Sequence, residues 1–189
     1  MSLGSAAWAE WLVDGDLSHE IDIREAPEDW KYGYTPIRHP EFPWIDPLPE
    51  NKGGLLYRLD SNLVEWAFQL TKNVKIGDTD AMKILRKKYV GYPNAQKPPF
   101  VLKGDHLAAM TFWHGEIMNN WANDWVDYWT EGEGEFVTSA MEETGTLQSL
   151  TFLENAGKVA ARRVLVVRAA SGFSMPPPGV YPAVDRSGE

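Results

Sequence analysis

The chain has 189 residues, of which 43% are hydrophobic and 24% charged, an ordinary composition for one globular domain with a substantial core. A formal net charge of −9 without a Lys- or Arg-rich stripe argues against nucleic acid as a partner, because polyanion binding depends on clustered positive charge. Without cysteine there is no disulfide framework or thiolate metal site, and no apolar run approaches the roughly 18 residues of a membrane-spanning segment.

The first fifty residues predict two strands and a long ordered loop. Met1 to Leu3 is interpreted as an expression leader, because Gly4 to Ala7 already resembles the interior of a domain. The strands are expected at about 8–13 and 17–23, on either side of an Asp-Gly turn. Residues 25–50 contain six prolines among aromatic residues, which favours an ordered surface loop over regular structure.

Two helices are predicted next. Asp60 or Ser61 can cap the first, whose apolar residues recur at helical spacing up to Leu70. The second runs from Asp78 to about Tyr89, and the basic residues 86–88 are expected on its solvated face.

Strands and helices alternate in the second half of the chain. We expect strands beginning at Phe100–Leu102 and spanning 136–140 and 163–169. Helices are expected at 115–130 and at 143–156, the second closed by a glycine. The aromatic residues of the first helix share one face: Trp121, Trp125, and Tyr128 or Trp129. This alternation predicts an α/β domain that begins in the middle of a sheet and is therefore part of a larger domain.

Glu142 and Glu143 stand where the predicted strand 136–140 gives way to a helix. Ligands of α/β sheets bind near the carboxyl ends of strands, and a carboxylate there can accept hydrogen bonds from two vicinal ribose hydroxyls. The other interpretation is that both carboxylates complement the dipole of the helix.

Phe112 and Trp113 precede another predicted helix and can either stack on a planar base or anchor the helix in the core. His114 beside them can serve as an acid, a base, a ligand or a polar cap. Ser171 and Gly172 follow the strand predicted at 163–169, where small residues allow a ligand to approach the backbone. The four histidines do not have metal-ligand spacing, so no metal site is expected.

Taken together, these segments resemble the purine nucleoside permease family. The order is Thr111 to Gly115, then Phe136 to Gly145 with its Met-Glu-Glu-Thr-Gly core, then Val164 to Ser171. The opening from Gly4 to Trp30 is similar too, so the resemblance covers roughly residues 4 to 180. It implies a single domain over 4–182, followed by a tail at 183–189.

The family is similar in fold to the nucleoside phosphorylases, which implies a three-layer αβα sandwich around a mixed sheet. The resemblance implies that Met141 and Glu142 bind the ribose and that Phe112 stacks on the base. The position at which an Asp or Asn would contact the purine is Gly172, which has no side chain, and this departure favours binding over catalysis. Family chains are longer than this one, and the sheet edges that this leaves exposed favour a homo-oligomer.

We therefore expect a purine nucleoside as the ligand, in a binding protein that serves nucleoside uptake without a cofactor. The alternative is an enzyme, a phosphorylase with phosphate as co-substrate or a nucleosidase, that cleaves the N-glycosidic bond. A third hypothesis is a carbohydrate-binding or interaction module that uses exposed tryptophans.

Overall fold

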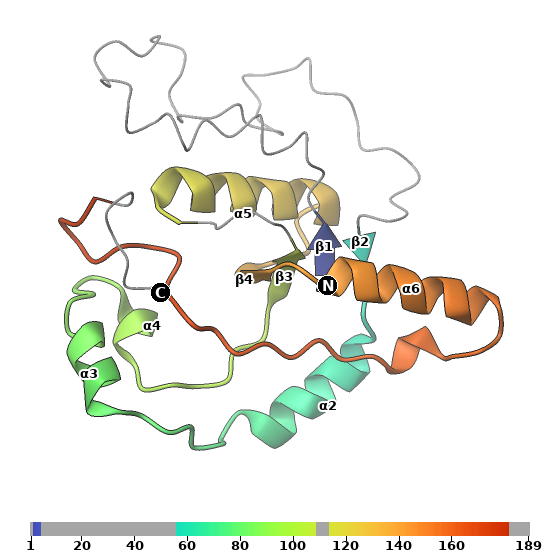
Figure 1. Ribbon diagram of the computed structural model, residues 1–189, viewed down its shortest axis with the longest axis horizontal. Helices are drawn as coiled ribbons and strands as arrows, with labels where there is room; N and C mark the ends of the chain where they lie inside the picture. The colour runs from blue at the N-terminus through green and yellow to red at the C-terminus, as the bar shows by residue number, and fades with distance from the viewer. Residues whose placement is uncertain (1, 5–55, 109–113, 182–189) are drawn as a thin grey trace, which may run out of the picture.

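The structure is a computed structural model, and it describes residues 2–4, 56–108 and 114–181. The strands predicted at 8–13 and 17–23, the proline-rich loop and the 183–189 tail lie outside the described residues. The described residues form an α/β fold in which helices surround a small sheet (Figure 1).

Four strands form one sheet in the order β2-β1-β3-β4. Strands β1 (Ser2–Gly4), β3 (Asp105–Ala108) and β4 (Phe136–Ala140) run parallel, and β2 (Leu56–Tyr57) is antiparallel to β1. The strand predicted at 136–140 is confirmed residue for residue. Ser2–Gly4, which overlaps the segment Met1 to Leu3, lies between two other strands of the sheet.

Helix α5 (Glu116–Thr130) provides the largest part of the core. Trp121 and Trp125 are fully buried on the predicted face, with their rings stacked at 5.0 Å between centroids. Trp129 follows one turn later and packs edge-on against Trp125. Figure 1 shows α5 on one side of the strands and α2 on the other. The predicted helix is therefore confirmed together with its buried aromatic face.

Helix α6 (Glu143–Asn155) follows β4 after two residues and contacts β1. It buries only Glu143 and Leu147, and it is tied to β2 by a hydrogen bond of 2.5 Å from the Tyr57 hydroxyl to Gln148 Oε1. The chain leaves the helix at Gly157, whose φ of 67° is left-handed, as the predicted glycine stop requires.

Helix α2 (Ser61–Thr71) is capped by Asp60, whose side chain accepts hydrogen bonds from the backbone N–H groups of Asn62 and Leu63. This confirms the predicted start of the helix. The one-turn helix α4 (Pro93–Gln96) was not predicted, although proline at the first position of a helix is a known start signal.

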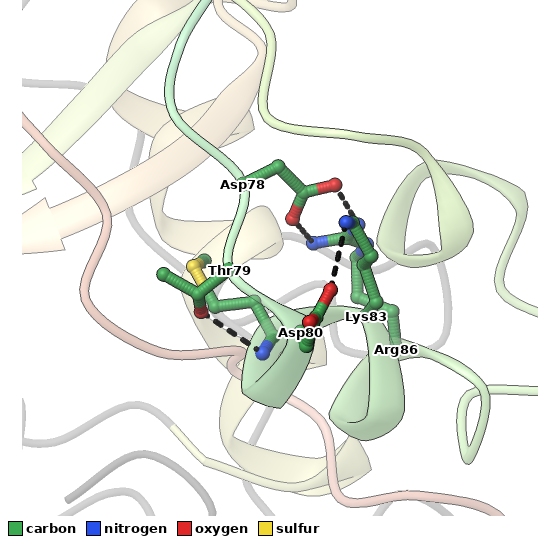
Figure 2. A network of polar contacts seen from close by, with 6 residues as sticks. Asp78, Thr79, Asp80, Lys83 and Arg86 are labelled. Carbon is green, nitrogen blue, oxygen red and sulfur yellow. Dashed lines mark hydrogen bonds and ion pairs between the residues drawn. The ribbon is translucent and has the colours of Figure 1, made fainter.

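Helix α3 (Asp80–Arg86) begins later than predicted because Thr79 caps it, and it ends at Arg86 instead of near Tyr89. Asp78 instead accepts two hydrogen bonds from the Arg86 guanidinium, at 2.8 and 2.7 Å, as Figure 2 shows. The Arg86 hydrogen bonds hold the pKa of Asp78 below its usual range. The expectation that all of 86–88 faces solvent is therefore wrong for Arg86, which is buried in this ion pair.

Two predicted strands are also wrong. Residues 100–102 form no strand, and Phe100 and Leu102 are exposed. The strand in this part of the chain is β3, which begins a few residues later and contains the fully buried Leu107. In place of the strand predicted at 163–169 there is a short 3₁₀ turn, η1 (Ala161–Arg163), followed by residues 164–170 without regular secondary structure. Val167 is 83% exposed there, so the apolar run does not enter the sheet among the described residues.

Candidate functional site

The carboxylates of Glu142 and Glu143 meet one guanidinium where β4 ends and α6 begins. Arg168, from the irregular segment after η1, donates through Nη2 to Glu142 Oε2 at 2.8 Å. Its Nε lies 2.6 Å from Glu143 Oε1. One planar cation thus bridges two adjacent acids, a geometry for which the forked donors of arginine are suited.

The two glutamates differ sharply in burial. The Glu143 side chain is only 8% exposed, and its Oε2 lies 3.2 Å from Nε2 of His106, which is buried on the neighbouring strand β3. The Glu142 side chain is 68% exposed. The cluster therefore runs from a buried anchor, His106 and Glu143, through Arg168 to a carboxylate that a ligand can reach.

The electrostatics keep the accessible carboxylate ionised. Hydrogen bonding from the backbone N–H of Glu142 itself, and then from the Arg168 side chain, holds the pKa of Glu142 below its usual range. Burial lowers the pKa of His106, so its imidazole is neutral at pH 7. The exposed end of the cluster thus presents a hydrogen-bond acceptor at neutral pH.

Met141 lies at the end of β4, directly before Glu142, and is 54% exposed. The predicted ribose-binding pair thus lies at the carboxyl end of a parallel strand, as the sequence suggested. Ser171 and Gly172 lie three and four residues beyond Arg168 and are exposed. Phe112 and Trp113 fall outside the described residues.

A second junction links the start of α5 to the chain after Gly172. The Gly115 N–H donates to the Ser174 carbonyl at 2.8 Å. The Asn119 amide donates to the same carbonyl at 2.7 Å. The segment that follows Phe112 and Trp113 is thereby held against the segment that follows Ser171 and Gly172. The first and third predicted segments thus come together through Gly115 and Ser174, and the second meets the third through Glu142 and Arg168.

Beside this junction is an open hollow of about 290 Å³ with mainly apolar walls. Two of its lining residues, Tyr89 and Phe173, have their rings in contact, with centroids 4.3 Å apart. It is lined by Tyr89, Tyr92, Pro93, Asn94, Ala95, Phe173, Ser174 and Met175.

Sequence reasoning gave no role to His106 or to Arg168, although Arg168 lies in the candidate segment that ends at Ser174. Arg168 follows a continuous apolar run, and a cation in that position is a signal that it faces an acidic partner. Among the described residues, no group of three His, Asp or Glu side chains could hold a metal ion. Within the same ranges, no helix is long and apolar enough to cross a membrane.

Comparison with known proteins assigns this α/β chain to a family. The model of the purine nucleoside permease family matches residues 1–186, so the chain belongs to that family. A probable purine nucleoside permease of Schizosaccharomyces pombe is 28% identical over 180 residues, covering 91% of this chain and 51% of its own length. A purine nucleoside permease of Candida albicans is 26% identical over 184 residues, covering 95% of this chain and 44% of its own length.

The chain therefore spans about half the length of the curated relatives it matches. No solved structure matches it at a significant level. The resemblance inferred from the order of the motifs is thus confirmed at the level of the family.

Proposed function

We propose that this chain binds purine nucleosides in the service of nucleoside uptake, with the Glu142 carboxylate as the acceptor for the ribose hydroxyls. The printed names of its relatives, purine nucleoside permeases, support the ligand class. The observation that carries the proposal is the exposed Glu142 carboxylate, held by Arg168 at the carboxyl end of a parallel strand.

Met141 borders the proposed ribose position, and Phe112 and Trp113 would contribute the aromatic face against the base. Ser171 and Gly172 would leave room for the base to approach the backbone, and a side chain at Gly172 would obstruct that approach. We further propose that the complete fold is a phosphorylase-like αβα sandwich and that the protein assembles as a homo-oligomer. The parallel β1-β3-β4 arrangement and the helix that follows β4 support this fold.

Titration calorimetry with inosine, uridine and ribose tests the proposal. We expect inosine to bind more tightly than uridine or ribose. Glu142→Ala should weaken inosine binding about tenfold or more, because hydrogen bonds to a charged acceptor contribute about 1.5–3 kcal/mol. Phosphate is included in a parallel titration to detect release of free base.

Glu133→Ala is the matched control, because Glu133 is also an exposed glutamate paired with an arginine, at 2.5 Å from Arg58 Nη1. It should leave inosine affinity unchanged. Equal binding of inosine and uridine, or equal inosine affinity in wild type and Glu142→Ala, would refute the proposal.

A further inference from the structure

We propose that Arg168 is a positioning residue that orients the Glu142 carboxylate for a vicinal diol and so sets the preference for ribonucleosides over sugars that lack both hydroxyls. This inference rests on the proposed nucleoside-binding function. It assigns a role to a residue that the motifs did not single out.

The first argument is the division of the guanidinium between two acids. Nη2 holds Glu142 at 2.8 Å and Nε holds Glu143 at 2.6 Å. Because these nitrogens belong to one rigid plane, the direction of one contact fixes that of the other. A lysine at this position would supply the charge from a single atom and would not fix both directions.

The second argument is that the far end of the cluster is anchored. Glu143 is buried in the first turn of α6, and its other oxygen lies 3.2 Å from the buried His106 on β3. Arg168 is therefore held by a group that belongs to the folded core, even though Arg168 itself lies in a segment without regular secondary structure. The orientation of an exposed carboxylate thus depends on the packed interior.

The third argument concerns what Glu142 would do without this contact. Its side chain is 68% exposed, and a glutamate in that setting samples many rotamers that a bound ligand would have to restrict. Arg168 engages one oxygen, Oε2, and so restricts the carboxylate before the ligand arrives. A diol approaching from solvent then meets an acceptor in a defined orientation.

The test compares inosine with 2′,3′-dideoxyinosine, which lacks both hydroxyls, in wild type, Arg168→Gln, Arg168→Lys and Glu142→Ala. We expect Arg168→Gln to lower the affinity for inosine about tenfold and the affinity for dideoxyinosine less than twofold. The ratio of the two affinities, which measures selectivity, should therefore fall sharply. Arg168→Lys should recover only part of the ratio. A role in folding alone would weaken both ligands equally.

The double variant Glu142→Ala/Arg168→Gln shows whether Arg168 acts through Glu142. If it does, Arg168→Gln causes no further loss of inosine affinity once Glu142 is absent. Arg58→Gln, which removes another exposed Arg–Glu pair, is the control and should change neither affinity. Thermal unfolding of every variant confirms that it is folded.

Three outcomes would overturn the inference. In the first, Arg168→Gln leaves the selectivity ratio at its wild-type value while Glu142→Ala abolishes it, so that the positioning role fails and the proposed function survives. In the second, Arg168→Gln causes the same loss with or without Glu142. In the third, Glu142→Ala itself leaves the ratio unchanged, which removes the proposed function and the positioning role together.

Discussion

Helices α5 and α2 are both amphipathic, yet only α5 is buried. Trp121 and Trp125 of α5 have no exposed surface, whereas α2 buries no residue and leaves Trp66 59% and Leu70 63% exposed. The apolar spacing of each sequence predicted a helix correctly. The difference shows that spacing encodes the helix, while the depth of burial depends on what lies against it.

Among the described residues, the contacts that hold the region around α2 and α3 are largely polar. Asp60 caps α2, the Asp78–Arg86 pair fastens α3, and Lys103 lies 2.5 Å from Glu65 of α2. Lys103 also lies over the Phe68 ring, 5.5 Å from its centroid. Apart from the largely buried Asp78–Arg86 pair, these contacts are exposed and contribute little each, so this region should be less stable than the sheet and α5.

The largest expected effect is that of truncating a tryptophan in each region. Trp125→Ala should lower the free energy of unfolding by about 3–5 kcal/mol, because it leaves a large cavity in the core. Trp66→Ala removes the same atoms from an exposed site and should change the free energy of unfolding by at most about 0.5 kcal/mol. Urea denaturation measures both, and equal losses would contradict the contrast between the two helices.

The next effect concerns the close approach of β4 to the chain before β3. A Cβ at Gly104 would overlap the Val137 side chain, so Gly104→Ala should destabilise the protein by about 1–3 kcal/mol. Val137→Ala in the same chain should relieve part of that loss. Gly145, within α6, has no atom within 4 Å of an added Cβ. Gly145→Ala should therefore be neutral or stabilise by up to about 1 kcal/mol. A Gly104→Ala protein as stable as Gly145→Ala would refute the packing described here.

The smallest effect is a pH dependence that belongs to the buried region. Burial lowers the pKa of His106 in the folded protein below its value of about 6.5 in the unfolded chain. At a pH between these two pKa values, the unfolded chain therefore binds more protons than the folded protein. The free energy of unfolding should therefore fall as the pH decreases through about 6.5. His106→Asn should make this dependence shallower between pH 7.5 and 5, as followed by urea denaturation at each pH. An unchanged slope in that variant would show that His106 does not titrate as the structure implies.

Local sequence signals predicted the parts of the fold whose cause is local. The aromatic spacing of α5, the cap at Asp60 and the glycine at 157 each act within one or two helical turns. The 136–140 strand was predicted because its β-branched and aromatic residues stand between a glycine-rich turn and a helix start.

The errors arose where the outcome depends on distant residues. The apolar run Val164 to Val167 has the composition of a buried strand. A strand also requires a neighbouring strand to pair with, and the sequence of the run does not determine whether one is present. Asp78 had two possible roles, as a helix cap or an ion-pair partner, and Arg86, eight residues away, decided between them.

The candidate site divides in the same way. Glu142 and Glu143 were found because they are adjacent at a strand-to-helix junction. His106 lies 37 residues before Glu143 in the sequence, and Arg168 lies 25 residues after it. Only the fold brings these two side chains into contact with Glu143. The acids were thus predictable from local sequence, whereas the groups that hold them were not.

The most direct test of the central claim is a crystal structure of the chain with inosine bound. The account predicts the ribose beside Glu142, with its 2′- and 3′-hydroxyls within hydrogen-bond distance of the carboxylate and Arg168 still in contact with it. A nucleoside bound only elsewhere, for example in the hollow lined by Tyr89, Tyr92 and Phe173, would contradict the claim that Glu142 binds the ribose.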